Sequence, residues 1–232
     1  MKKNQQGKSK VLNKNKIAYE SIRNLIVTNE LKAGDIITEN VLAEQLGMSR
    51  TPIREAIKIL SKEGFLEIHN GVGTYVKHIT VKDILDINEV RTILESTALK
   101  TAVRNIKRDD LIALLNRWIK LKEHLEANPG IDPSITAEIY KLDAETHSFI
   151  VDNCDNQFLK EVYDDVRLKV QRFQRMITNA VKDDLNTVLL HIRILEYIKD
   201  GDIEAAADLI RRHVFDSLQN VLKNNDINLF LL

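Results

Sequence analysis

Four side chains in the second half of the sequence have the types and spacing of metal ligands. Asp143 and His147 are four residues apart, so on a helix they share one face, among apolar neighbours. His191 and His213 each lie on an apolar helical face further along the chain. Buried polar groups need partners, and one divalent cation would satisfy all four side chains at once. The alternative is a polar core in which each side chain has its own hydrogen-bond partner.

Imidazole nitrogen and carboxylate oxygen suit zinc, nickel, iron or manganese, and zinc is our first choice. Four protein ligands leave one or two positions of a six-coordinate ion open for a small carboxylate. An enzyme that uses this metal for hydrolysis or oxygen chemistry is the alternative function. It would need a general base, but Glu145, between the two ligands of its helix, would face away from them. The sequence also has no Gly-rich phosphate loop, nucleophile elbow or His-Glu-x-x-His motif.

Two arginines are expected to face the same interior. Arg91 and Arg167 each share a helical face with apolar residues. A buried guanidinium group needs an anionic partner. That partner is either the carboxylate of a bound ligand or an acidic side chain of the protein, of which Glu95 is the obvious one for Arg91.

A second set of residues has the chemistry of DNA recognition. Residues 49–55 read Ser-Arg-Thr-Pro-Ile-Arg-Glu. Ser49 is a good helix N-cap, and the proline is tolerated only in the first helical turn. Arg50 and Arg54 are four residues apart, so both guanidinium groups leave one face near the helix N-terminus. Recognition helices meet base edges and phosphates at that end.

The elements expected around this segment form a winged helix-turn-helix. Residues 39–46 predict a short helix, and Gly47 and Met48 a tight turn into the recognition helix, which Gly64 ends. Residues 65–76 alternate like two strands around a glycine-containing turn, which predicts a β-hairpin wing. An amphipathic helix comes before these elements.

Composition and charge divide the chain into two domains. Six of the eight glycines fall before residue 74. Residues 1–78 hold 13 Lys and Arg against 8 Asp and Glu, a net charge of +5, and residues 79–232 hold 21 against 26, a net charge of −5. A basic module joined to an acidic one is expected if only the first meets a polyanion. We therefore predict a DNA-binding domain at residues 17–79 and a second domain at residues 80–232.

The second domain has steady helical periodicity and few helix breakers, which predicts an all-α antiparallel bundle. Its six expected helices lie at residues 81–103, 109–127, 134–153, 156–178, 182–199 and 202–224. Residues 1–16 contain six lysines and no acidic residue, and we expect a disordered basic arm there, with or without phosphate contacts. The apolar residues 229–232 are expected to dock on the bundle or at a dimer contact.

The remaining composition excludes several classes of protein. The single cysteine, Cys154, rules out an intramolecular disulfide and a cysteine-rich metal site. No apolar run reaches the ~18 residues of a membrane helix, and the lysines near the N-terminus have no apolar core of a secretory signal behind them. These observations predict a cytoplasmic protein with no membrane partner.

Residues 17–79 resemble the winged-helix domain of the GntR superfamily of bacterial repressors. The resemblance implies that Arg50 and Arg54 read guanines or phosphates, and that Thr51 contacts the backbone or a thymine methyl group. It also implies that the wing, at Asn70 and Gly71, approaches the minor groove or its phosphates. Many relatives carry a basic residue where this chain has Asn40, so that contact is in doubt.

The Asp-x-x-x-His pair and the two later histidines resemble the FadR-type ligand-binding (FCD) domain, and the six helices resemble its shorter, VanR-like branch. Asp143, His147, His191 and His213 fall on the metal-ligand positions of that domain. The resemblance implies a homodimeric repressor on a palindromic operator, since two-fold symmetry pairs the two DNA-binding domains. It also implies that an organic acid or sugar acid is the effector, with release of DNA as the commoner response.

Overall fold

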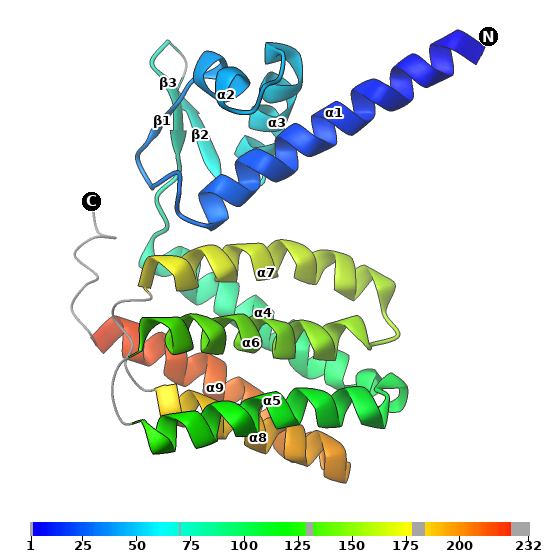
Figure 1. Cartoon of the computed structure of the whole chain (residues 1–232), viewed down its shortest axis with the longest axis vertical. Coiled ribbons are helices and arrows are strands. Elements are labelled where there is room, and N and C mark those ends of the chain that lie inside the picture. Colours follow the sequence, from blue (N-terminus) through cyan, green and yellow to red (C-terminus); the bar gives the residue numbers. More distant parts are fainter. Residues whose placement is uncertain (1, 70, 129–131, 178–183, 224–232) are drawn as a thin grey trace. The chain divides into compact units, whose positions relative to one another are not determined.

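The computed structural model describes residues 2–69, 71–128, 132–177 and 184–223. They form two compact units that divide between Ile79 and Thr80. The first unit contains three helices and a small sheet (Figure 1), namely α1 (Lys2–Val27), β1 (Ile36–Ile37), α2 (Glu39–Gln45), α3 (Arg50–Lys62), β2 (Leu66–His69) and β3 (Gly73–Val76). The strands are antiparallel in the order β1-β3-β2, with Leu66 opposite Val76. The short strand β1 was not expected from the sequence.

The helix-turn-helix is held by apolar contacts between α1 and α3. Ala18 and Ile22 of α1 and Ile53 and Leu60 of α3 are completely buried. Gly47 joins α2 to α3 with φ +62°, a left-handed conformation that glycine adopts without steric cost. The winged helix-turn-helix predicted from the sequence is confirmed.

Residues 2–16, for which the composition predicts a disordered arm, are helical in this structure as the first part of α1. Lysine is a good helix former and no proline lies between residues 2 and 27, so the helix continues outward from its packed half. Figure 1 shows the first half of α1 extending past α2 and α3.

The second unit is a bundle of six described helices, as predicted. They are α4 (Val81–Asn105), α5 (Arg108–Ala127), α6 (Pro133–Asp152), α7 (Gln157–Ile177), α8 (Asp184–Asp200) and α9 (Ile203–Lys223). Thr80 and Asp83 form a capping box that starts α4. The helix α4 packs against α6, α7 and α9, while α5 packs on α8. The apolar tail at residues 229–232 lies outside the described residues.

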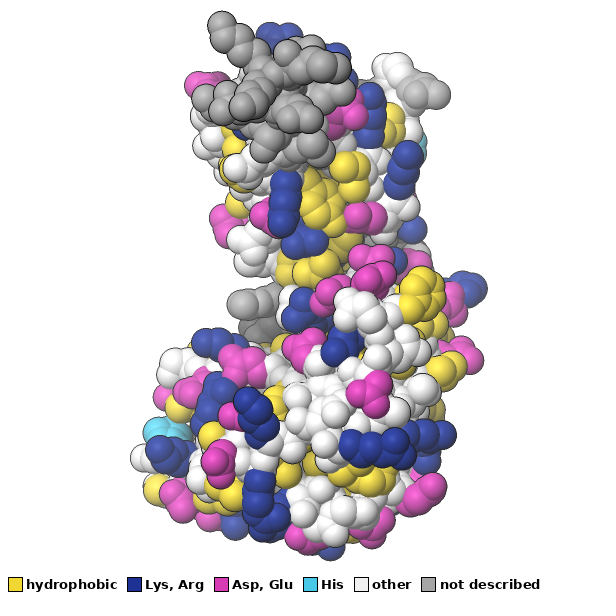
Figure 2. All heavy atoms as spheres, turned by 90° about the vertical axis from the view of Figure 1, so that its right-hand side faces the viewer, with side chains coloured by type: hydrophobic (Ala, Val, Ile, Leu, Met, Phe, Trp, Pro, Cys, Tyr) yellow, Lys and Arg dark blue, Asp and Glu magenta, His cyan; other side chains and the backbone are white. Residues whose placement is uncertain are grey.

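The core of the bundle is apolar around a polar centre. Trp118, Leu142, Ile150 and Ile194 are among its fully buried side chains. Its surface carries both signs of charge, and on the face in Figure 2 the basic and acidic side chains are interspersed. Neither sign forms a continuous patch on that face of the bundle, so a polyanion-binding surface is not seen there.

Candidate metal centre and DNA-binding face

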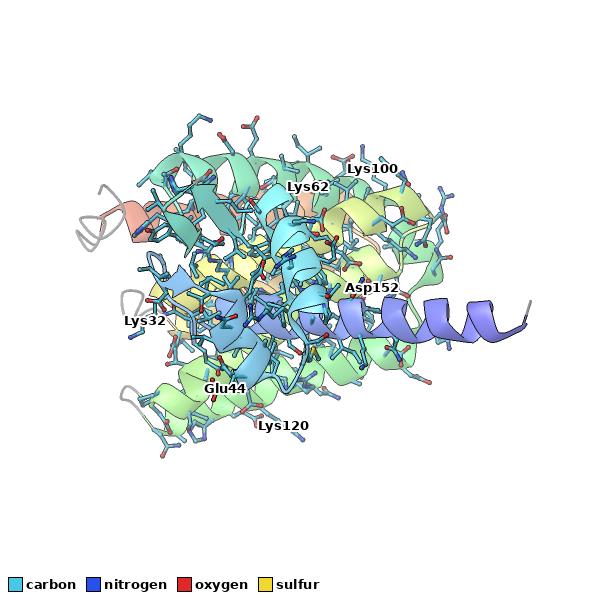
Figure 3. The ribbon with its side chains drawn as sticks, turned by 90° about the horizontal axis from the view of Figure 1, so that it is seen from above. Lys32, Glu44, Lys62, Lys100, Lys120 and Asp152 are labelled. Carbon is cyan, nitrogen blue, oxygen red and sulfur yellow. The ribbon has the colours of Figure 1, made fainter. Side chains whose placement is uncertain are left out.

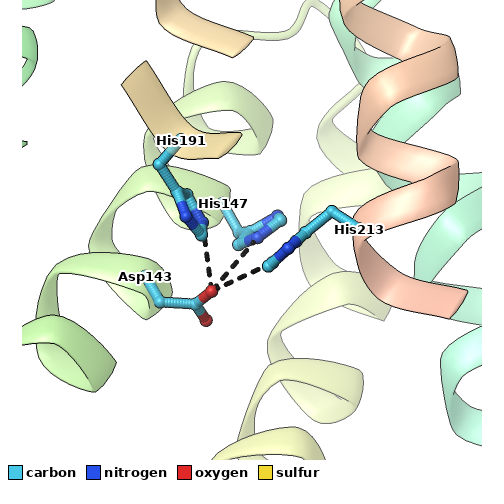
Figure 4. Close-up of side chains that lie close together, drawn as sticks. All are labelled: Asp143, His147, His191 and His213. Carbon is cyan, nitrogen blue, oxygen red and sulfur yellow. Dashed lines mark hydrogen bonds and ion pairs between the residues drawn. The ribbon is translucent and has the colours of Figure 1, made fainter. Parts of the chain in front are cut away.

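The polar centre of the bundle is made by the four side chains selected from the sequence (Figure 4). Asp143 and His147 lie one turn apart on α6, His191 lies on α8 and His213 on α9. One ligand atom of each side chain lies within 4.8 Å of those of the other three. All four residues are buried, with exposed fractions of 4% or less. Three helices thus place their ligand atoms close together in the interior of the bundle.

Asp143 is the common neighbour of the three histidines. Its Oδ1 lies 3.0 Å from Nε2 of His191, 3.2 Å from Nε2 of His213 and 3.6 Å from Nε2 of His147. Its other oxygen, Oδ2, accepts a hydrogen bond of 3.0 Å from the amide of Gln174 on α7. The three Nε2 atoms therefore surround one carboxylate oxygen, and the second oxygen is oriented by α7.

Hydrogen bonds at the far side of two imidazole rings set which nitrogen faces the cluster. Nδ1 of His147 donates to Oε2 of Glu95 over 2.7 Å, and Nδ1 of His191 donates to the backbone carbonyl of Thr187 over 2.8 Å. Because both acceptors lack a proton, the hydrogen sits on Nδ1 and the lone pair of the neutral ring sits on Nε2. This is the tautomer in which a histidine binds a metal through Nε2.

These Nε2 atoms fit a bound cation. The Nε2 atoms of His147 and His191 are buried and make no hydrogen bond of acceptable geometry, although both face Asp143. A buried nitrogen without a hydrogen bond costs free energy, and a metal ion would use its lone pair. Three imidazole nitrogens and one carboxylate oxygen are the donor set of a zinc, nickel, iron or manganese site.

The two buried carboxylates are ionised. Burial opposes the charge on Asp143, but His147 and the hydrogen bonds of the cluster hold the pKa of Asp143 well below its usual range. Burial also opposes the charge on Glu95, yet Arg91 and His147 lower the pKa of Glu95 to about 2. The centre thus concentrates negative charge in a buried place, which favours a cation.

The surroundings shift the pKa values of His213 and His147 in opposite directions. Burial, reinforced by the nearby His191, lowers the pKa of His213 to about 4, so this ring is neutral near pH 7. Burial also disfavours the charged form of His147, but the carboxylates of Glu95 and Asp143 outweigh it and raise its pKa. A divalent ion would supply the positive charge that these carboxylates favour and would displace the proton of His147.

The tryptophan of the core holds His191 in place. The rings of Trp118 and His191 are stacked, with centroids 4.3 Å apart and an angle of 10° between the planes. Nε1 of Trp118 donates to Oγ1 of Thr146 over 2.9 Å, which fixes the indole ring. The His191 imidazole is thereby restrained both by this contact and by its bond to Thr187.

The two arginines expected at the interior have different surroundings. Arg91 is buried, and its Nε donates to Glu95 over 2.8 Å while its Nη2 lies 3.9 Å from Oδ2 of Asp143. Of the two partners that the sequence allows for Arg91, the acidic side chain Glu95 is therefore present, and the pair lies beside the cluster. Arg167 is half-buried: its Nη2 donates to Asp164, one turn back on α7, over 2.8 Å. Its Nε is buried and makes no hydrogen bond, so one side of the guanidinium group faces the interior.

Sequence reasoning missed three residues that support the cluster. Glu95 was considered only as a partner of Arg91, whereas it also binds His147 and accepts from the hydroxyl group of Tyr163 over 2.9 Å. No pattern in the sequence singles out Gln174, which donates to Asp143. The spacing of Arg91 and Glu95 on one helix face was the only feature of the sequence that pointed to any of these supporting residues.

The predicted DNA-contacting residues of α3 are on its exposed face. Ser49, Arg50, Thr51 and Arg54 are exposed, whereas the apolar side of α3 faces the core of its unit. Ser49 is the N-cap residue, but its side chain makes no capping hydrogen bond. Figure 3 looks down on this unit, with Glu44 labelled on α2 and Lys62 at the end of α3.

The wing is formed by β2 and β3, which pair from Leu66 opposite Val76 to His69 opposite Gly73. Gly71 is exposed at its tip, with φ +76°. Asn70, the other predicted wing contact, lies outside the described residues. Val72, which follows Gly71, is 72% exposed. The tip of the wing therefore exposes the glycine backbone and one apolar side chain.

Both units match known protein families. Residues 14–76 match the model of the bacterial regulatory proteins of the gntR family, and residues 86–216 match the FCD domain. The chain belongs to the GntR family, with an FCD domain. The predicted membership of the GntR superfamily with an FCD domain is thereby confirmed.

Individual relatives of this GntR regulator are similar over nearly their whole length. It is 28% identical over 214 residues to the uncharacterized HTH-type transcriptional regulator YdhC of Bacillus subtilis (strain 168), covering 90% of this chain and 93% of the relative. It is 27% identical over 214 residues to the gluconate operon transcriptional repressor of the same organism, covering 90% and 84%. The solved structure of E. coli McbR/YncC has a TM-score of 0.74 at 20% identity, covering 90% of this chain and 97% of that one, which shows a shared fold.

These relatives are transcriptional regulators, so the GntR regulator described here is not an enzyme. The carboxylate of Glu145 points away from the cluster and pairs with Arg117, and the two side chains are 37% and 46% exposed. None of the helices in the described ranges is long and apolar enough to cross a membrane.

Proposed function

We propose that this regulator is a repressor whose bundle binds one divalent metal ion and senses a small carboxylate. The observation that carries the proposal is the pair of buried Nε2 atoms of His147 and His191, turned toward Asp143 by hydrogen bonds to Glu95 and Thr187. Zinc is the first candidate, and nickel, manganese and iron are the others. Asp143, His147, His191 and His213 would hold the ion, which would bind the oxygens of the effector as a Lewis acid.

Arg91 is the residue best placed to meet the charge of an effector. It is buried, and its Nη2 lies 3.9 Å from Oδ2 of Asp143, so its guanidinium group is beside the metal ligands. A guanidinium group at that place would bind one oxygen of a carboxylate while the metal takes another. Arg167 is a weaker candidate because its side chain is partly exposed and paired. The name of the gluconate operon repressor refers to a sugar acid, which supports this ligand class.

On DNA, a homodimer would place two α3 helices on a palindromic operator. Arg50 and Arg54 would read guanines or adjacent phosphates, and Thr51 would contact the backbone or a thymine methyl group. Ser49 would meet a phosphate with its uncapped hydroxyl group, and the wing, at Asn70 and Gly71, would approach the minor groove. Sedimentation of the free protein tests the dimer, and the two-fold symmetry of a selected operator tests the geometry.

The link between the two events would run through α4. This helix begins at Val81, directly after its N-cap residue Thr80 and the end of the DNA-binding unit, and it carries both Arg91 and Glu95. An effector that binds Arg91 and the metal together would favour one position of α4. The effector can change the affinity for the operator only if it binds the DNA-binding arrangement of the protein more or less tightly than the non-binding one. Release of DNA is the expected direction for a repressor.

The experiment that tests the metal is elemental analysis of purified protein, comparing the wild type with His191→Ala and Asp143→Asn. His124→Ala is the matched control, because His124 is exposed on α5. We expect about one ion per chain in the wild type and in the control, and a loss in both cluster variants. Equal content in all four proteins, or none after reconstitution of the wild type, would show a polar core without metal.

A further inference from the structure

A two-bond ion pair joins the recognition helix to the helix before it. Nε of Arg54 donates to Oε1 of Glu39 over 2.7 Å, and Nη2 of Arg54 donates to Oε2 of Glu39 over 2.7 Å. Pairs such as Lys58 with Glu55 link neighbouring turns of a single helix. The pair of Arg54 and Glu39 instead bridges α3 and α2, with both oxygens of the carboxylate engaged. Such bidentate pairing fixes the plane of the guanidinium group.

The pair leaves a defined part of Arg54 available. A guanidinium group has five N–H groups in a rigid fork. Glu39 uses the edge made by Nε and Nη2. Both N–H groups of Nη1 and one of Nη2 remain, and Nη1 and Nη2 together form the end of the fork. Two parallel donors of this kind fit O6 and N7 of a guanine.

Both partners are anchored on rigid elements and reachable from outside. Glu39 is the first residue of α2, where the helix N-terminus favours a carboxylate, and Thr38 caps that helix by accepting from the amide of Val41. Arg54 stands on a helix whose other face, including Ile53 and Ile57, is buried. The Arg54 and Glu39 side chains are 56% and 32% exposed, so DNA can reach the end of the fork.

We propose that Glu39 is a positioning residue for DNA recognition, which holds Arg54 with the end of its fork presented to a guanine of the operator. The proposal rests on the proposed role of Arg54 in reading bases. Glu39 carries a negative charge on the DNA-binding face, so it also repels phosphates wherever Arg54 finds no guanine. It therefore lowers affinity for unrelated DNA while it raises affinity for the operator.

Glu39 is expected to raise affinity for the operator and to lower affinity for unrelated DNA. A purely electrostatic effect of its charge would instead lower both affinities. An operator is first selected from a random duplex pool with the wild-type protein. Affinities for this duplex and for an unrelated duplex of equal length are then measured at one salt concentration, for the wild type, Glu39→Gln and Glu39→Ala. Glu44→Gln is the matched control, because it removes the same charge from an exposed position of the same helix.

For both Glu39 variants we expect tighter binding to the unrelated duplex and weaker binding to the operator. The ratio of the two affinities should fall about tenfold, the lower part of the range for one bidentate base contact. Selection repeated with Glu39→Ala should lose its preference at one base pair of each half-site. Glu44→Gln should change both affinities by the same factor and leave the ratio unchanged.

Equal tightening on both duplexes would overturn the proposal, because Glu39 would then only mask Arg54 or repel phosphates. Arg54→Ala, measured in parallel, separates this failure from a failure of the proposed role of Arg54. If Arg54→Ala keeps the wild-type ratio, Arg54 does not read bases and both ideas fall. If Arg54→Ala loses the ratio and the Glu39 variants keep it, only the positioning role falls. In the Arg54→Ala background, Glu39→Ala should leave the ratio as it is.

Discussion

Nδ1 of His147 lies 2.7 Å from Oε2 of Glu95, and both side chains are almost completely buried, with exposed fractions of 1% and 0%. The same carboxylate accepts from Nε of Arg91 and from the hydroxyl group of Tyr163. Glu95 thus ties three elements, α4, α6 and α7, to one side of the cluster. A carboxylate behind a histidine fixes the ring and makes Nε2 a better donor for a metal.

Glu95→Gln should therefore weaken metal binding although Glu95 is not itself a ligand. The neutral amide accepts the Nδ1–H bond less strongly and leaves Arg91 without its charged partner. We expect metal affinity to fall by about 10- to 100-fold, measured by competition with a chelator of known affinity. Glu145→Gln is the matched control, since Glu145 lies on α6 beside the ligands but pairs with Arg117. Equal affinities in Glu95→Gln and Glu145→Gln would contradict the supporting role.

Trp118 offers a direct optical signal of the site. It is the single tryptophan of the chain and stacks on His191 with ring centroids 4.3 Å apart. A paramagnetic ion bound to His191 would lie within quenching distance of the indole ring. We expect Ni²⁺ to quench tryptophan fluorescence until one ion per chain is bound, and Zn²⁺ to compete with it. His124→Ala should behave like the wild type, and quenching that persists in His191→Ala would place the ion elsewhere.

The fold was predictable because its signals are local. Helical periodicity and helix-breaking residues placed all six helices of the bundle, and no end differs from its expected position by more than two residues. The supporting partners of the cluster were not predictable in this way. Tyr163 and Glu95 are 68 residues apart, and Glu95 and His147 are 52 apart. Their contact depends on how α4, α6 and α7 are rotated against one another, which periodicity does not specify.

Two features of the structure differ in part from the pattern in the sequence, each for its own local reason. Periodicity placed Arg167 on an apolar face, where its Nε is buried, but Asp164 on the neighbouring turn accepts a hydrogen bond from its Nη2. The lysines of residues 1–16 suggested disorder from composition, whereas α1 continues through them from its packed half. In the first case a nearby acid decides the direction of a long side chain. In the second, a helix that is already nucleated extends at little cost in free energy.

The stability of the metal-free protein should fall as the pH is lowered from about 6.5 to about 4. Burial beside His191 lowers the pKa of His213 to about 4, while the unfolded chain takes up this proton near pH 6.5. Between these values the unfolded state binds more protons at this group, so acidification favours unfolding, by up to about 1.4 kcal/mol per pH unit.

Urea unfolding of chelator-treated protein across this pH range tests the effect. The raised pKa of His147 acts in the opposite direction, so His213→Gln is compared with the wild type to isolate one group. The variant should lose less free energy of unfolding than the wild type over the same range. Parallel pH profiles for the two proteins would mean that His213 takes up its proton equally in the folded and unfolded states.

Removal of residues 1–16 should reduce the salt dependence of DNA binding without changing base preference. These residues carry six lysines, and each phosphate contact that they make adds about 0.9 to the slope of log affinity against log salt concentration. The packed half of α1 remains in the truncated protein, because its buried residues Ala18, Ile22 and Ile26 follow the deletion. The slope is measured on the selected operator and on an unrelated duplex, for the full chain and for residues 17–232. A decrease that is equal on both duplexes identifies contacts to phosphates, whereas an unchanged slope on both shows that this half of α1 does not touch DNA.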